Sequence, residues 1–256
     1  MALFKTDGAE IFHQCSGKGN PVLLTHGIFA TGDMWSKQLE ETLDGYCLIS
    51  WDMRGHGRSS SPEEASHYSE KATVNDMRLL LDHYGAERAV LIGHSLGGYM
   101  SLAFWLKYPQ RVSALVLEST GPGYRSDEAR AQWNRFAHRQ ADKLEKEGLD
   151  LLSKYPDING SLHRSVDGLI HAVRGMMIQR DDEVINALPK IEVPTLVVIG
   201  EQDVWLHDAA TYMTAKLKHG ELISIPEAGH LPNITHPAHF NRELRLFLNR
   251  LNGEKP

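Results

Sequence analysis

The chain has 256 residues, with 27 lysines and arginines against 33 aspartates and glutamates, which gives a formal net charge of −6. Hydrophobic residues make up 41% and charged residues 23%, a composition typical of a folded globular protein and not of a disordered chain. The negative balance disfavours a general nucleic-acid binder, which needs a basic face to neutralise phosphates. The length suits one large α/β domain better than two independent ones.

Several features point to a cytoplasmic protein. No apolar stretch approaches the roughly 20 residues that a membrane-spanning helix needs, and no basic run suggests binding to an anionic membrane. The first residues lack the long apolar segment of a secretory signal. The two cysteines, Cys15 and Cys47, fall in strand-like segments, and we expect them to be reduced core thiols.

Short apolar runs alternate with helical patterns in the first half of the chain. The runs are rich in Val, Ile and Leu without strict alternation, as expected for strands buried on both faces. Strand–helix–strand repetition predicts a mostly parallel sheet with helices on both faces. The expected strands are Ala9–Gln14, Pro21–Thr25, Tyr46–Trp51, Ala89–Gly93 and Ser113–Ser119, and the expected helices are Met34–Leu43, Ser69–Tyr84 and Leu96–Lys107.

This alternation stops after Ser119. No buried strand is expected between Gly121 and about Leu188, where the patterns are helical. We therefore predict a core domain of residues 1–120 and 189–256, with residues 121–188 forming a helical lid inserted into it, since such insertions commonly carry ligand contacts. The expected elements from here on are helices at Ser126–Glu147 and Leu162–Gln179, strands at Pro194–Gly200 and Glu221–Ile225, and a last helix at Pro237–Leu251.

The sharpest local motif is a candidate nucleophile. Residues 93–97 read Gly-His-Ser-Leu-Gly, directly after one apolar run and before a predicted helix. Gly-x-Ser-x-Gly between a strand and a helix is typical of a catalytic serine on a strained turn. A Cβ atom at Gly93 or Gly97 would clash in such a turn. Ser95 would lie at the start of the helix, where backbone N–H groups favour negative charge.

A serine hydroxyl is a weak nucleophile, so it needs a base and a group that orients the base. Asp203 follows the predicted strand 194–200, and His230 lies in the loop after the last strand. Both loops are expected at the same sheet edge as Ser95, because the carboxyl ends of parallel strands emerge together. Two other carboxylates compete for the role of acid: Glu201 is less well placed, and Glu118, at the end of a strand, remains a minor alternative.

A metal site is not predicted. His236 and His239 are three residues apart at a helix start, but no third ligand has a matching spacing.

With these residues in hand, the sequence resembles the α/β-hydrolase superfamily over nearly the whole chain outside the lid. The chain order of serine, acid and base agrees with that family. Residues 26–29, His-Gly-Ile-Phe, resemble its oxyanion loop, and residues 52–59 resemble its structural Asp-x-Arg-Gly-x-Gly turn. The resemblance implies an α/β-hydrolase fold with the lid inserted after the sixth strand. It also implies an oxyanion hole formed by the backbone N–H groups of Ile28 and Leu96, and no metal or organic cofactor.

The turn at residues 52–59 carries Asp52, Arg54 and His56, whose side chains could all do chemistry. Because the resemblance makes this turn structural, we interpret the three side chains as scaffold.

The resemblance covers several reactions. A serine nucleophile argues against the dehalogenase and epoxide-hydrolase branches, which use aspartate at that turn. Carbon–carbon bond hydrolases of aromatic degradation usually place Asn before the serine and Trp after the histidine, where this chain has His94 and Leu231. We therefore predict a serine hydrolase that cleaves carboxylic esters through an acyl-enzyme on Ser95. A carbon–carbon bond hydrolase and a small-molecule receptor without turnover remain alternatives.

Candidate substrate contacts are side chains next to the expected catalytic positions or on the lid. They are apolar or aromatic, which indicates a small to medium apolar substrate. The candidates are Phe29, Trp205 and Leu231 in the core, and Tyr124 and Trp133, with Phe136 beside them, in the lid.

Overall fold

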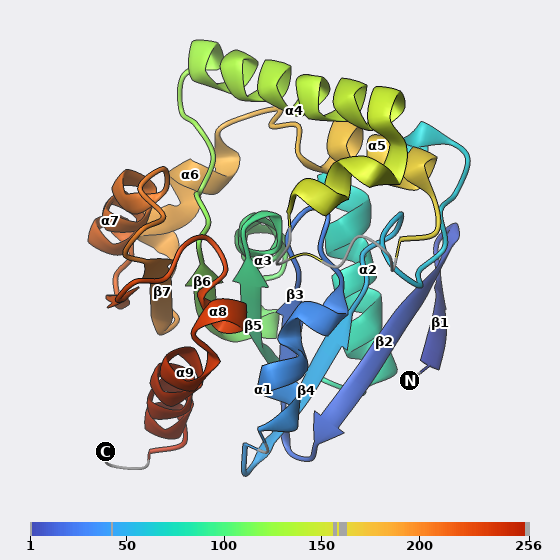
Figure 1. The fold of residues 1–256 in the computed structure, drawn as a ribbon. Helices are drawn as coiled ribbons and strands as arrows, with labels where there is room; N and C mark the ends of the chain where they lie inside the picture. Colours follow the sequence, from blue (N-terminus) through green and yellow to red (C-terminus); the bar gives the residue numbers. More distant parts are fainter. Residues whose placement is uncertain (1, 42, 156–157, 159–162, 254–256) are drawn as a thin grey trace.

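A computed structural model describes residues 2–41, 43–155, 158 and 163–253. One eight-stranded sheet forms the centre of the molecule, in the order β1-β2-β4-β3-β5-β6-β7-β8 (Figure 1). The first two strands are antiparallel to their neighbours, and all later pairs are parallel. The strands are β1 Ala2–Thr6, β2 Ala9–Gly17, β3 Asn20–Thr25, β4 Tyr46–Trp51, β5 Ala89–His94, β6 Val112–Glu118, β7 Thr195–Gly200 and β8 Gly220–Ile225. The predicted α/β fold with a mostly parallel sheet is confirmed.

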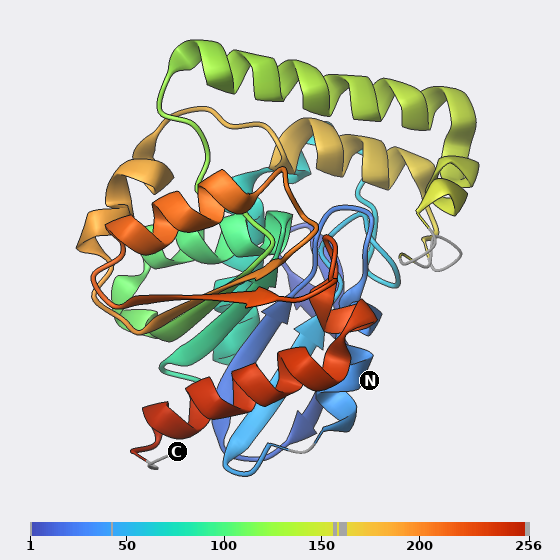
Figure 2. The same cartoon turned by 60° about the vertical axis from the view of Figure 1, so that its left-hand side comes forward.

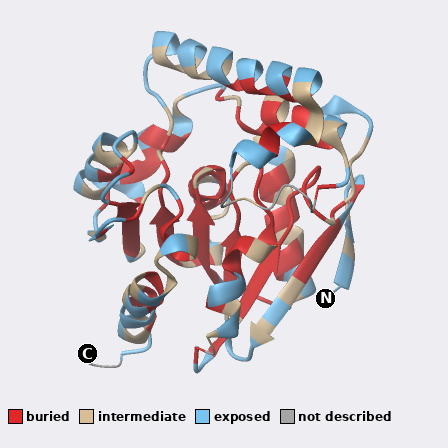
Figure 3. Ribbon diagram, in the orientation of Figure 1, coloured by how far each residue is buried: buried red, intermediate tan, exposed pale blue. Residues whose placement is uncertain are grey.

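Successive side chains of the central strands enter two different apolar clusters, because neighbouring residues of a strand point to opposite faces. Leu23 and Leu91 pack with α2, α3 and α7, whereas Val22 and Val90 pack with α1 and α9. Figure 2 shows α9 along one face of the sheet, and Figure 3 shows the buried central strands between the helical layers. These helices are α1 Ser36–Glu40 after the short turn η1 Gly32–Trp35, α2 Glu70–His83, α3 Leu96–Lys107, α7 His207–Lys216, α8 Pro232–Thr235 and α9 Pro237–Leu251. Two further short turns are η2 Ala65–His67 and η3 Pro109–Arg111.

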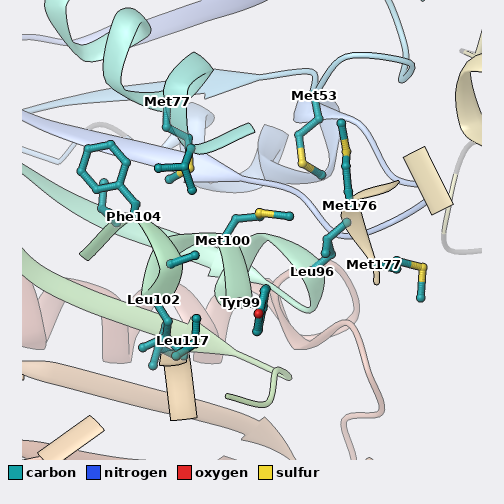
Figure 4. Close-up of a cluster of buried hydrophobic side chains, with 14 of the residues drawn as sticks. Met53, Met77, Leu96, Tyr99, Met100, Leu102, Phe104, Leu117, Met176 and Met177 are labelled. Carbon is teal, nitrogen blue, oxygen red and sulfur yellow. The ribbon is translucent and has the colours of Figure 1, made fainter. Parts of the chain in front are cut away.

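The chain between β6 and β7 is helical where it is described, as expected. Its elements are α4 Asp127–Glu147, η4 Gly148–Lys154, α5 Val166–Met176, α6 Glu183–Ala187 and η6 Leu188–Lys190. The long helix α4 lies above the sheet and packs on α5 (Figure 1). Met176 and Met177 belong to the same apolar cluster as Leu96 and Met100 of α3 (Figure 4). The helical segment is therefore continuous with the core that carries α3.

Three hydrogen bonds tie α4 to the segment that follows α5. The indole N–H of Trp133 donates to the Met177 carbonyl at 2.7 Å. The side chain of Asn134 both accepts from the Gln179 amide, at 2.9 Å, and donates to the Gln179 carbonyl, at 2.9 Å. These bonds add to the apolar packing of Ala137, Ala141 and Leu144 of α4 in the core.

Most predicted elements occur near their predicted bounds, and α3 and α9 match them residue for residue. Strand β1 and the short helices α6, α7 and α8 were not expected. In place of one helix predicted at Met34–Leu43 the chain forms η1, which ends at Trp35, and α1, which ends at Glu40, and the predicted start of a helix at Leu162 lies outside the described residues.

The expectation of two core thiols is wrong for Cys15, which is exposed, while Cys47 is half-buried. Their strands β2 and β4 are adjacent, and the two Sγ atoms are 2.6 Å apart. The error arises because β2 lies near the sheet edge, so every second side chain near its end faces solvent.

Among the described residues, no helix combines the length and apolar character needed to cross a membrane.

Candidate active site

Ser95 lies on a sharp turn between β5 and α3. Its backbone has φ 50° and ψ −115°, a conformation that is strained for a residue with a side chain. A Cβ atom at Gly93 would lie 2.2 Å from the Gly97 carbonyl oxygen, so the turn requires glycine there. The Ser95 amide donates to the Glu118 carbonyl at 2.9 Å, and the Thr120 hydroxyl donates to the Ser95 carbonyl at 2.6 Å. The strained turn is thus held from the neighbouring strand β6.

The start of α3 lies against the carboxyl end of β3. A Cβ atom at Gly97 would lie 2.2 Å from the Thr25 carbonyl oxygen, so glycine allows this close approach. The approach brings the Leu96 amide near the loop that contains Ile28. Leu96 is the first residue of α3 and has no acceptor inside the helix. Among the described residues, the Ile28 amide donates to no backbone carbonyl. Their joint action on a substrate oxygen stays a prediction.

Asp203 and His230 meet as a hydrogen-bonded pair. The Nδ1–H of His230 donates to Asp203 Oδ2 at 2.8 Å. That bond leaves Nε2 of neutral His230 as an acceptor, the state that a general base needs. The Asp203 carboxylate is buried and the His230 ring is 45% exposed, so the acid is sheltered while the base is accessible.

The loops that carry the pair also contact each other through the backbone. The Gln202 amide donates to the Ala228 carbonyl at 2.8 Å. A Cβ atom at Gly200 would lie 2.0 Å from the Gly229 carbonyl oxygen, so only glycine permits the approach. The contact between Asp203 and His230 is therefore supported by the packing of the loops that follow β7 and β8.

His94 links the Ser95 turn to the His230 loop, a contact that we did not predict. Its Nε2–H donates to the His230 carbonyl at 2.9 Å, and the two ring centroids are 4.8 Å apart. Burial lowers the pKa of His94 well below its ordinary value, so the ring is neutral. The ring of His230 thus lies next to the residue that precedes Ser95. The Ser95 hydroxyl is not bonded to His230 here; such catalytic bonds often shorten only when a substrate binds.

The two rival acids have other partners. Glu118 is fully buried and accepts from the Asn233 amide at 2.8 Å. Burial raises its pKa to about 8. Glu201 accepts from the Glu227 amide at 3.0 Å. Neither carboxylate contacts His230, whose carboxylate partner is Asp203.

Asp52 and Arg54, two of the side chains interpreted as scaffold, form hydrogen bonds and ion pairs inside the protein. Asp52 accepts from the backbone amides of Gly32, at 2.7 Å, and Arg58, at 2.8 Å. Arg54 forms a two-point ion pair with buried Asp76, with both N···O distances at 2.7 Å. These contacts agree with a structural role for the turn.

The candidate substrate contacts lie in different environments. Phe29 and Leu231 are buried beside the site. Trp205 is 92% exposed, so most of it faces solvent and not the interior of the protein. Trp133 is half-buried, with its ring 6.0 Å from that of Tyr124 and 5.5 Å from that of Phe136. Contact between any of these side chains and a substrate stays a prediction.

Metal binding finds no support in the described part of the chain, where no group of three or more His, Cys, Asp and Glu side chains could hold an ion. His236 contacts the hydroxyl of Thr235, and His239 contacts Glu243.

Comparisons with known proteins agree with this architecture. A family model described as "alpha/beta hydrolase fold" matches residues 20–147. A putative 2-succinyl-6-hydroxy-2,4-cyclohexadiene-1-carboxylate synthase of Bacillus subtilis is 28% identical over 89% of both chains. A putative carbamate hydrolase of Variovorax paradoxus is 30% identical over 92% of this chain and 94% of that one. The solved structure of a thermophilic esterase from Thermogutta terrifontis is 29% identical and has a TM-score of 0.80, with 95% of this chain and 94% of that chain covered.

Proposed function

Because the chain belongs to the α/β-hydrolase family, we propose that it is a serine hydrolase that cleaves carboxylic esters of small to medium apolar substrates. The observation that carries this proposal is the His230–Asp203 bond, next to the strained turn of Ser95. It leaves the accessible nitrogen of His230 ready to accept a proton. The similarity to the Thermogutta esterase supports the choice of ester hydrolysis.

In the proposed reaction Ser95 attacks the ester carbonyl carbon while His230 takes the hydroxyl proton. Asp203 holds the imidazole tautomer and offsets the positive charge that forms on the ring. The amides of Ile28 and Leu96 donate to the oxygen that becomes negative. His230 then gives its proton to the leaving alcohol, and a water molecule activated by the same histidine releases the acid.

The test is hydrolysis of nitrophenyl esters of increasing acyl length by wild type and Ser95→Ala. We expect kcat to fall roughly a million-fold in the variant, because the covalent step is lost. In the same assay Asp203→Asn should lower kcat by about 10⁴-fold, because an amide holds the wrong tautomer of His230. The acyl length with the highest kcat/KM reports the size of the acyl pocket.

Equal rates in wild type and Ser95→Ala would refute the assignment of the nucleophile. Absence of turnover with every ester, combined with a ligand that raises the melting temperature without being converted, would instead favour a receptor.

A further inference from the structure

The orientation of the Ile28 amide is controlled by the carbonyl of the same peptide unit. In a trans peptide the C=O of Gly27 and the N–H of Ile28 point in opposite directions, so holding one holds the other. The Gly27 carbonyl accepts from His26 Nδ1–H at 2.7 Å and from the Ala30 amide at 3.2 Å. The Met53 amide donates to His26 Nε2 at 2.8 Å, which places the proton of neutral His26 on Nδ1.

The next residue, Phe29, has a left-handed backbone with φ 65°. This conformation is unfavourable for a bulky side chain, so contacts from outside the loop must hold it. The Phe29 carbonyl accepts a hydrogen bond from Nε2–H of His163 at 2.7 Å. His163 is buried, and it comes from the segment between η4 and α5, 134 residues further along the chain. The loop of Ile28 is thus bonded to the helical segment above it.

The tautomer of His163 is fixed by its second bond. The Gly57 amide donates to His163 Nδ1 at 3.1 Å, so the proton of the neutral ring is on Nε2, where it reaches Phe29. The two histidines therefore hold consecutive parts of one loop in opposite tautomers: His26 through Nδ1–H, and His163 through Nε2–H.

We propose that His163 is a positioning residue for the oxyanion hole. As a neutral Nε2–H imidazole it holds the Phe29 carbonyl and, through the strained residue 29, the direction of the Ile28 amide. This role rests on the proposed function and adds to it a residue that touches neither the substrate nor Ser95. It also connects the lid segment to the part of the site that stabilises negative charge.

The surroundings of His163 keep the ring neutral. The imidazole of His56 lies between those of His26 and His163, with ring centroids 4.9 Å and 5.7 Å away. Burial lowers the pKa of His163, and the same cause lowers the pKa of His26 to about 4 and that of His56 well below its ordinary value. The Asp52 carboxylate acts in the opposite direction on His163 and His26, but burial dominates. A protonated His163 could no longer accept from the Gly57 amide.

Two substitutions separate the two bonds of His163. In His163→Gln the side-chain N–H lies at about the position of Nε2 and can still donate to Phe29. In His163→Asn the side-chain oxygen can accept from Gly57, but the side chain is too short to reach Phe29. His171→Gln is the matched control, because this half-buried ring of α5 packs on Tyr68 and makes no bond to the loop.

The readouts are kcat and KM for nitrophenyl esters, the rate at which a fluorophosphonate reacts with Ser95, and the melting temperature. We expect His163→Asn to lower kcat and the phosphonylation rate by about 10- to 100-fold while KM changes little, because the developing charge is less well stabilised. His163→Gln should stay within about threefold of wild type. His171→Gln should match wild type in every rate.

A His163→Asn variant that is folded and reacts as fast as wild type overturns the positioning role alone. A wild type that neither hydrolyses an ester nor reacts with the fluorophosphonate refutes the proposed function, and the positioning role with it. If His163→Asn does not fold, ¹⁵N NMR of histidine-labelled wild type decides. A neutral His163 with its proton on Nε2 at neutral pH supports the role, and a charged ring or the other tautomer overturns it.

Discussion

At the scale of single residues, the proposed site consists of three side chains that follow three different strands. The sharp turn at Ser95 could be predicted from sequence because its motif has a strand before it and a helix after it, and only glycine fits the flanking positions. Asp203 and His230 could be found because carboxyl ends of parallel strands share one edge. His94 and His163 could not be found in this way. Each acts through one backbone carbonyl far away in the chain, and no spacing in the sequence marks such a contact.

Glu118 gives a prediction on the pH dependence of stability. Burial raises its pKa from the ordinary value of 4.5 to about 8. The unfolded chain ionises this group near pH 4.5, while the folded protein keeps the proton. Stability from the protonated group is therefore fully present below about pH 4.5 and is lost as the pH rises towards 8, by at most about 1.4 kcal/mol per pH unit.

Glu118→Gln tests this dependence, because the amide oxygen can still accept from Asn233. We expect the variant to lose less stability than wild type between about pH 5 and pH 8. The measurement is the free energy of unfolding in urea at several pH values, with Glu63→Gln as the exposed control. Parallel pH curves for wild type and Glu118→Gln would contradict the prediction.

At the scale of elements, predictability followed the clarity of the apolar pattern. Helix α3 is buried over most of its length and joins two buried strands, so its pattern identified both ends. Strand β1 has mostly exposed side chains and forms a hairpin with β2 at the sheet edge. Its short sequence therefore lacks both the apolar run and the alternation that indicate a strand. The only local sign is the Asp7-Gly8 turn, in which Gly8 has φ 78°.

The pair of strands β2 and β4 gives a second prediction. Because the Sγ atoms of Cys15 and Cys47 are 2.6 Å apart, we expect diamide to join them in one disulfide. Two S–H bonds break, an S–S bond forms, and diamide takes up both hydrogen atoms. Burial raises the pKa of Cys47 to about 12, which disfavours the thiolate of Cys47 as the attacking group.

The readouts for this pair of cysteines are the loss of two hydrogen masses from the protein and the change in its free energy of unfolding. The bond would close the loop between residues 15 and 47 and should raise the free energy of unfolding by about 3 kcal/mol. Cys15→Ser is the control and should show neither change. Two free thiols after treatment, or a dimer in place of an internal bond, would contradict the geometry.

At the scale of the whole molecule, the buried pair of Arg54 and Asp76 ties the loop after β4 to helix α2. Arg54 also donates to the His67 carbonyl at 2.8 Å. Removing one partner leaves a buried charge without compensation, so we expect Asp76→Asn to lower the free energy of unfolding by about 3–5 kcal/mol. Urea unfolding measures the change.

The matched control for Asp76→Asn is the exposed pair of Lys218 and Glu192. Glu192→Gln should leave the urea midpoint nearly unchanged, because solvent screens exposed ion pairs. Equal effects of the two substitutions on the free energy of unfolding would show that burial does not determine how much the Arg54–Asp76 pair stabilises the fold.

The central claim is that Ser95 forms the covalent intermediate. The most direct measurement is to treat wild type, Ser95→Ala and His230→Ala with a nitrophenyl alkylphosphonate and to locate the adduct by peptide mass spectrometry. We expect one phosphonyl group on Ser95 of wild type, no adduct on Ser95→Ala, and much slower labelling of His230→Ala, because the base is missing. An adduct on another residue, or ester turnover by a protein whose Ser95 stays unmodified, would contradict the account.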